Sequence, residues 1–212
     1  GQTQLVSVIM VILIALAILA LVLPWAMNMI QKKKDMKSLD DIYNFFQTLD
    51  KTIRDIAKNG GEETLNLKTT GIIEVYSDSY SSPLNNSIMF TFYSKVSNIA
   101  IGVGEIPLNT PNTNETATLG IDSPSVIFGN ATMMDDRIRI SYRLWYRTLN
   151  DSLGHAYKIV LNTTNDYQNT TAGFLRIQRL GSETIGDLTI TKINICLLYT
   201  SDAADEGLGV DL

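Results

Sequence analysis

The chain has 212 residues, which is enough for one domain of ordinary size and an additional segment but not for two large domains. It carries 17 Lys and Arg residues against 22 Asp and Glu residues, and the resulting net charge of −5 is too weak to indicate a partner. One His and one Cys exclude a disulfide framework and leave too few ligands for zinc or for Cys–His and Ser–His–Asp centres. We therefore expect a protein that is not an enzyme and that holds no cofactor or metal.

The N-terminal segment, residues 1–31, contains no charged residue and no His. Its apolar run from Leu5 to Ile30 would span about 39 Å as a helix, more than the ~30 Å hydrocarbon core of a bilayer. Pro24 removes one helical hydrogen bond and predicts a kink. Trp25 suits the membrane interface, and Lys32–Lys34 marks the polar boundary. This segment is predicted to be an apolar helix that spans the membrane.

The helix is predicted to continue through residues 32–61 with an amphipathic pattern. Its apolar residues are spaced three and four apart, which draws one stripe along a helix: Leu39, Ile42, Phe46, Leu49, Ile53 and Ile56. Gly60-Gly61 ends the pattern. The stripe is short for a coiled coil, so we expect it to pack against the chain's own sheet.

From residue 62 to 195 the apolar residues alternate with polar ones, and Asn, Ser, Pro, Asp and Gly clusters separate the segments. This pattern predicts a β-rich, mostly antiparallel head and an α+β fold. We expect a surface loop over Glu105–Val126 and one solvated face on the strand that begins at Arg137. The expected strands are Thr64–Lys68, Gly71–Ser77, Ile88–Lys95, Ile99–Val103, Arg137–Leu149, Ala156–Leu161, Gly173–Arg179 and Leu188–Ile195.

Few side chains in the head suggest chemistry. Asp135-Asp136 could bind a cation, but a turn is the better interpretation because no other carboxylate is close in sequence. His155 stands alone beside Gly154, which favours a solvated or core-edge position over proton transfer. The lysines at 32–34 fit a membrane interface better than nucleic acid, and no Gly-rich phosphate loop is present. We expect no nucleic-acid partner.

Six Asn-x-Ser/Thr sequons lie in the head, more than its composition alone would produce by chance. If they carry N-linked glycans, the head faces the outside of the cell. Loops rich in Thr and Asn are the alternative explanation, and most of the sequons fall in predicted loops. The acceptor residues are Asn85, Asn114, Asn130, Asn150, Asn162 and Asn169.

Residues 196–212 resemble a translated sequencing adapter. The stretch from Cys196 to Glu206 matches the reading of a common transposon-end adapter, and Gly209-Val210-Asp211-Leu212 matches its constant end. We therefore treat this tail as non-native and expect the native sequence to be interrupted near Ile195.

The Gly1-Gln2-Thr3-Gln4 start, the uncharged helix with a late proline, the amphipathic continuation, the Gly-Gly break and the β-rich head together resemble an archaeal type IV pilin. The resemblance implies a processing peptidase, residence in the cytoplasmic membrane before assembly, and pilus assembly machinery as a partner. It also implies an extracellular helical homopolymer with helices in its core and a glycosylated, adhesive outer surface. Leu5 and Val6 depart from the family, which often has Glu near the fifth mature position. Gly1 would normally be absent from the mature subunit.

The side chains expected in the filament core run along the apolar helix. An all-round apolar helix is stable both in lipid and among copies of itself. The residues are Leu5, Val8, Ile9, Ile12, Leu13, Leu16, Leu19, Leu23 and Pro24.

Two alternatives remain open from the sequence. An archaellin, the subunit of a motility filament, would have the same architecture. A monomeric ectodomain on a single membrane span would also fit, as a binding module. By the positive-inside rule Lys32–Lys34 would place the head in the cytoplasm, whereas the sequons favour the outside.

Overall fold

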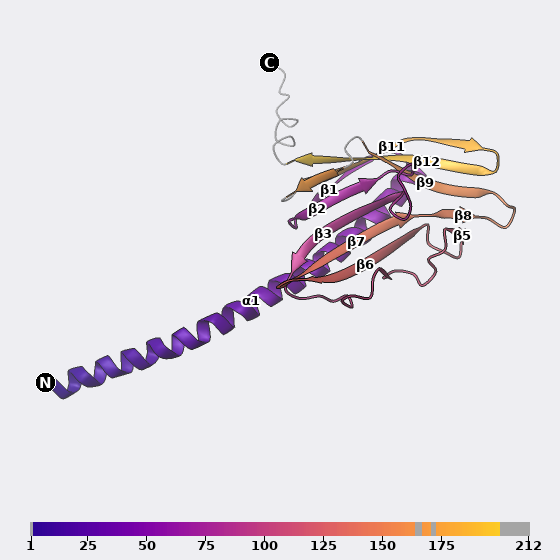
Figure 1. Cartoon of the computed structure of the whole chain (residues 1–212). Coiled ribbons are helices and arrows are strands. Elements are labelled where there is room, and N and C mark those ends of the chain that lie inside the picture. Colours follow the sequence, from indigo (N-terminus) through magenta and orange to yellow (C-terminus); the bar gives the residue numbers. More distant parts are fainter. Residues whose placement is uncertain (1, 164–166, 171–172, 200–212) are drawn as a thin grey trace, which may run out of the picture.

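The computed structural model describes residues 2–163, 167–170 and 173–199, with side chains from residue 8 onward except in 167–170 and at 199. A single helix, α1 (Gln2–Asn59), extends from a head built of β-strands (Figure 1). About half of the helix projects from the head as a free rod, and the other half lies against the strands. The expected α+β fold is confirmed.

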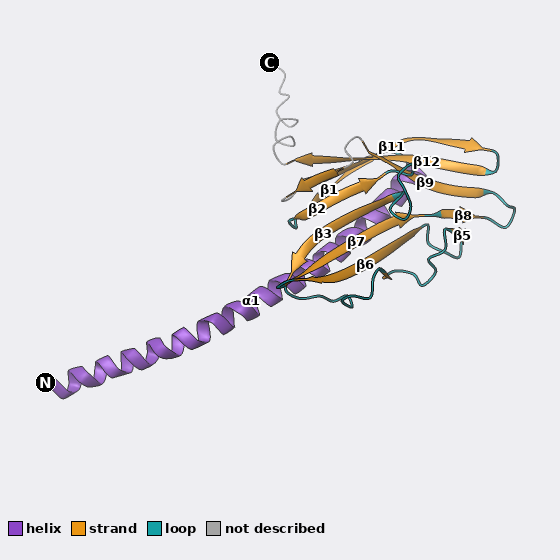
Figure 2. Ribbon diagram, in the orientation of Figure 1, coloured by secondary structure: helices purple, strands orange, loops and turns teal. Residues whose placement is uncertain are grey.

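The strands form two six-stranded sheets (Figure 2). Sheet A has the order β1-β11-β12-β9-β8-β5, and sheet B has the order β10-β2-β3-β7-β6-β4. Pairing is antiparallel except between β12 and β9 and between β5 and β8, so the prediction of a mostly antiparallel head is confirmed. The bounds are β1 (Glu62–Leu67), β2 (Gly71–Tyr76), β3 (Ser87–Ser94), β4 (Ile106–Pro107), β5 (Thr116–Thr118), β6 (Ser125–Met134), β7 (Arg137–Tyr146), β8 (Thr148–Asn150), β9 (Ala156–Thr163), β10 (Tyr167–Thr170), β11 (Gly173–Ile185) and β12 (Leu188–Tyr199).

The predicted stripe of α1 forms the centre of the hydrophobic core. Leu39, Phe46, Leu49 and Ile53 are fully buried, and Ile42 and Ile56 are 1% and 5% exposed. They pack with inward-facing residues of both sheets, and the helix contacts β1, β7, β11 and β12. Each such side chain contributes about 1.5–3 kcal/mol on burial. The stripe is thus buried within its own head, as expected, and the coiled-coil alternative is wrong.

The end of α1 follows the Gly-Gly signal. The Gly60 amide donates to the Ile56 carbonyl at 2.8 Å, and Gly60 has a φ of 79°. That left-handed conformation favours glycine because it has no Cβ, and it closes the helix before β1 begins.

Several strand predictions need correction. β6 and β10 were missed, and the expected loop over Glu105–Val126 contains β4, β5 and the first residues of β6. Gly129 and Asn130 weakened the alternating pattern of β6, although Gly129 lies where a Cβ would meet Ile99 at 2.7 Å. Ile99–Val103 is not a strand and makes only a bridge between Ile101 and Ala131.

The helix is continuous through Pro24, as expected of one long helix that includes both segments (Figure 1). The end of the last strand differs from expectation. β12 continues to Tyr199, beyond the expected limit at Ile195, because residues 196–199 still pair with β11. The rest of the predicted tail, residues 200–212, lies outside the described residues.

The two sheets are joined by the buried side chain of Asn86. Its Nδ2 donates to the carbonyls of Tyr146 at 2.9 Å and Ile159 at 2.8 Å, and its Oδ1 accepts from the Leu161 amide at 2.8 Å. Tyr146 ends β7 in sheet B, whereas Ile159 and Leu161 belong to β9 in sheet A. Asn86 has a φ of 55°, a conformation that Asn tolerates better than most residues. This side chain therefore links the sheets where they meet.

Replacing this residue should loosen that junction. Asn86→Gly keeps the left-handed backbone but removes three buried hydrogen bonds, and we expect it to lower the free energy of unfolding by about 2–4 kcal/mol. Asn86→Ala should cost more, because its Cβ also strains the backbone. Urea denaturation of the full chain in detergent measures both. Wild-type stability in the Gly variant would contradict the assigned role.

Candidate functional site

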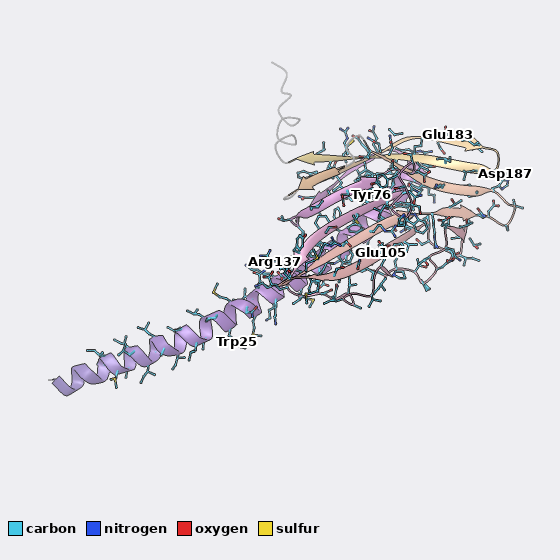
Figure 3. All side chains as sticks on the ribbon, viewed as in Figure 1. Trp25, Tyr76, Glu105, Arg137, Glu183 and Asp187 are labelled. Carbon is cyan, nitrogen blue, oxygen red and sulfur yellow. The ribbon has the colours of Figure 1, made fainter. Side chains whose placement is uncertain are left out.

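The most unusual surface of the molecule is the free part of α1, Val8–Ile30, which we call the bare segment. Its large hydrophobic side chains are exposed by 45% at Met29 to 78% at Leu21, and they extend from all sides of the helix, Trp25 among them (Figure 3). Nothing else in the described part of the chain covers it. Because soluble proteins rarely expose large contiguous apolar patches, this surface marks an interaction with lipid or with another apolar surface.

The residues predicted for a filament core lie on the bare segment, apart from Leu5, whose side chain is outside those described. All the others are exposed. The remaining faces of the helix are equally uncovered, so the structure of one copy does not single out the predicted residues. They are Val8, Ile9, Ile12, Leu13, Leu16, Leu19, Leu23 and Pro24.

The bare segment is long and apolar enough to cross a membrane. Its 23 residues extend about 35 Å at a rise of about 1.5 Å each, against a hydrocarbon core of about 30 Å. Lys32–Lys34 is exposed just beyond it, as expected for a polar boundary.

Asp35 makes the first contact between the helix and the head. Its carboxylate accepts from the Lys95 amide at 2.8 Å, at the end of β3, and from the Gln31 side chain at 2.6 Å. The strand end and the helix are therefore tied together directly after the lysines. This contact helps fix the direction in which the bare segment leaves the head.

A second polar contact lies deeper, between the helix and β7. Tyr146 donates from its hydroxyl to the Asp50 carboxylate at 2.9 Å, and Arg54 pairs with the same carboxylate at 2.9 Å. Asp50 is only 5% exposed and Tyr146 only 1%. Burial, followed by the nearby Asp50 charge, raises the pKa of Tyr146 well above its usual value. Sequence reasoning missed this pair because its two residues lie 96 positions apart and meet only through the fold.

Two arginines on β7 and directly after it attach long loops to the outer face of sheet B. Arg143 pairs with Glu105 and lies 4.5 Å over the Phe128 ring. Arg147 donates to the carbonyls of Ser123 at 3.0 Å and Asn112 at 2.8 Å. The predicted solvated face is thus wrong for this end of the strand, since loops cover it. Burial lowers the pKa of Arg147.

The sequons differ in accessibility. Asn114 and Asn150 are exposed, each with an exposed hydroxyl residue two positions later, and Asn162 is exposed in β9. Asn130 is half-buried in β6. Asn85 is half-buried, and the hydroxyl of Ser87, the third residue of its sequon, donates to the Leu84 carbonyl.

The expected concentration of sequons in loops is wrong. Four of the acceptor residues belong to strands: Asn130, Asn150, Asn162 and Asn169, the last without a described side chain.

The other candidates behave as ordinary surface groups. Asp135-Asp136 forms the turn between β6 and β7, as predicted. His155 is exposed and contacts Asp151 at 2.9 Å; this hydrogen bond is the main cause that lowers the pKa of the Asp151 carboxyl. Among the described residues no group of three or more His, Cys, Asp or Glu could hold a metal ion.

No protein-family model, no curated protein and no solved structure matches this chain.

The contact between Tyr146 and Asp50 should show in the pH dependence of stability. The folded pKa of Tyr146 is raised, and burial raises that of Tyr142 to about 12, both above the ordinary value of about 10. Their contribution to stability is therefore fully present below pH ~10 and is lost above it, by about 1.4 kcal/mol per pH unit for each tyrosine.

Tyr146→Phe should remove its share of this alkaline loss and also cost about 1–3 kcal/mol at pH 7, because a buried acceptor loses its donor. Tyr142→Phe is the matched control, because that hydroxyl donates only to Asn98, at 3.3 Å. Denaturation series from pH 7 to 12 measure both variants. If Tyr146→Phe and Tyr142→Phe lowered the free energy of unfolding by the same amount at pH 7, the stabilising role of the Tyr146–Asp50 contact would be contradicted.

Proposed function

We propose that the chain is a structural subunit of an extracellular, type IV pilus-like filament and polymerises through its N-terminal helix. The observation that carries the proposal is the bare segment, an apolar surface attached without interruption to a folded head. The helix would lie in the cytoplasmic membrane before assembly and in the filament core afterwards. A processing peptidase and pilus assembly machinery would be its partners on the way.

The proposal is supported physically because the bare segment can be stable both in a lipid bilayer and in a bundle of helices. Apolar side chains on all sides of a helix are satisfied by lipid tails, and they are equally satisfied by the same side chains of neighbouring copies. No covalent bond between subunits is needed, because each buried apolar side chain contributes about 1.5–3 kcal/mol relative to exposure. The proposal assigns no catalytic step to the chain.

The head would form the outer surface of the filament and contact the surroundings, which makes surface adhesion its proposed role. The exposed sequon residues Asn114, Asn150 and Asn162 support an external position because N-glycans are added outside the cytoplasm. Lys32–Lys34 argues in the opposite direction by the positive-inside rule. The orientation therefore has to be measured, and glycan occupancy measures it.

Polymerisation through the helix can be tested with one matched pair of substitutions. The full chain, purified in detergent, should form thin filaments when the detergent is removed, as seen by electron microscopy. Ile12→Lys places a charge in the apolar core at a cost of about 2.5–3.5 kcal/mol per subunit, so filament yield should fall at least about tenfold. Ile185→Lys changes an isoleucine of similar exposure, 62% against 53%, at the end of β11 in the head and should assemble normally.

A monomeric ectodomain on a single membrane span would give a different result in the same experiment. A wild-type chain that stays monomeric in micelles and inserts singly into vesicles would overturn the filament proposal in favour of an anchored ectodomain. Equal assembly of the Ile12→Lys and wild-type chains would show that the helix is not the polymerisation surface.

Glycan occupancy should follow the accessibility of the sequons. In material from a cell with an oligosaccharyltransferase, mass spectrometry should find Asn114 and Asn150 modified, and Asn85 modified less, because the Ser87 hydroxyl of its sequon is buried. Asn114→Gln should remove one glycan and serves as the control for assignment. A chain without any glycan would remove the argument for an external head.

A further inference from the structure

A groove opens at the end of the head remote from the bare segment. It has a volume of about 450 Å³ and lies between the last turns of α1 and strands β8, β9 and β12. Its apolar lining comes from Ala57, Leu119, Leu149, Tyr157 and Ile159.

Four cationic residues also line the groove, against one carboxylate, Asp122. Arg54 and Lys58 come from the end of α1, and Lys158 comes from β9 and pairs with Asp78 at 2.6 Å. Arg147 is buried and held by loop carbonyls, and Arg54 pairs with Asp50 at 2.9 Å. Among the described residues, Lys58 is therefore the cation of the groove whose charge no ion pair offsets. A ligand for this groove would be apolar with negative charge beside it.

The opposite end of the head presents that chemistry. The β6–β7 hairpin ends in Met133 and Met134, which are 58% and 44% exposed, followed by the exposed pair Asp135-Asp136. We call residues 133–136 the hairpin tip. Its two carboxylates give it a charge of −2, which falls to −1 when the adjacent Arg137 at the start of β7 is counted.

The two features lie at opposite ends along the strands. Arg137, next to the hairpin tip, lies at the end of the head from which α1 projects (Figure 3). Asp187 lies at the other end, directly before β12, whose first residues pair with the beginning of β9. Thr189 and Thr191 of this β12 segment line the groove.

We propose that the hairpin tip of one copy docks into the groove of the next copy along the filament. The inference rests on the proposed function, and it assigns the contact between heads. Methionine side chains adapt to irregular apolar surfaces, so Met133 and Met134 suit the apolar lining. Asp135 and Asp136 then lie beside Lys58 at the rim of the groove, and this pairing of opposite charges favours the orientation over its reverse.

The placement of the two surfaces also explains an open polymer. Each copy offers a different surface at each end, and such a heterologous contact between parallel copies does not close on itself unless the rotation closes a ring. Copies whose helices all point the same way bring the tip of one head toward the groove of its neighbour.

Cross-linking between engineered cysteines tests the contact in the full chain. Cys196→Ser provides a background without the native cysteine, and Met134→Cys and Leu119→Cys place one thiol at the tip and one at the groove. Both positions are 44% exposed, so the substitutions should leave the fold intact. Filaments are treated with a short bismaleimide and separated on a denaturing gel.

Each combination of the two cysteine variants should give a different pattern on the gel. The double variant should give a ladder of multimers, and a one-to-one mixture of the two single variants should give dimers and no larger species. Each single variant alone should stay monomeric. Dimers from one single variant alone would indicate a like-with-like contact and would overturn the proposal.

The result also separates this contact from the proposed function. Filaments that form normally but give no ladder would overturn the docking of tip and groove while leaving the helix-driven polymer in place. Absence of filaments from the wild-type chain would overturn both.

Discussion

The whole architecture depends on one apolar surface that no described part of the chain covers. α1 is a single helix, yet the apolar stripe from Leu39 to Ile56 is buried against the strands and the segment from Val8 to Ile30 is bare. Exposure of such a surface to water is unfavourable by roughly 25 cal/mol for each Å². Lipid or another apolar surface around the bare segment would remove this unfavourable exposure.

The bare segment and the part of α1 that packs in the head are mechanically coupled because they belong to one continuous helix. The backbone runs through Pro24 and past the lysines without interruption, and Asp35 and Asp50 fix its second half to β3 and β7. A force on the bare segment is thus transmitted along a helix into the hydrophobic core, and not through a flexible linker. In a filament under tension, this arrangement would load the core packing of the head before any loop is stretched.

The sequence predicted the helix and the strands correctly wherever a single hydrophobic periodicity dominated a segment. The three–four spacing from Leu39 to Ile56 identified the buried face of the helix, and alternation located most strands within a few residues. They failed where tertiary contacts override local pattern: Gly129 in β6 accommodates Ile99, and Arg147 is buried because loop carbonyls from distant residues surround it. The groove joins parts of α1, β8, β9 and β12, so no local sequence signal could reveal it.

If the chain forms the proposed filament, the balance between membrane and filament cannot rest on the helix alone. Lipid tails are about as apolar as leucine side chains, so transfer of the bare segment from a bilayer into a helix bundle changes little hydrophobic free energy. The proposed contacts between heads would form only in the polymer, and their contribution would therefore favour assembly directly. If Met133 and Met134 occupy the groove beside Lys58, the helix keeps the subunits together while the heads determine that they leave the membrane as a directed filament.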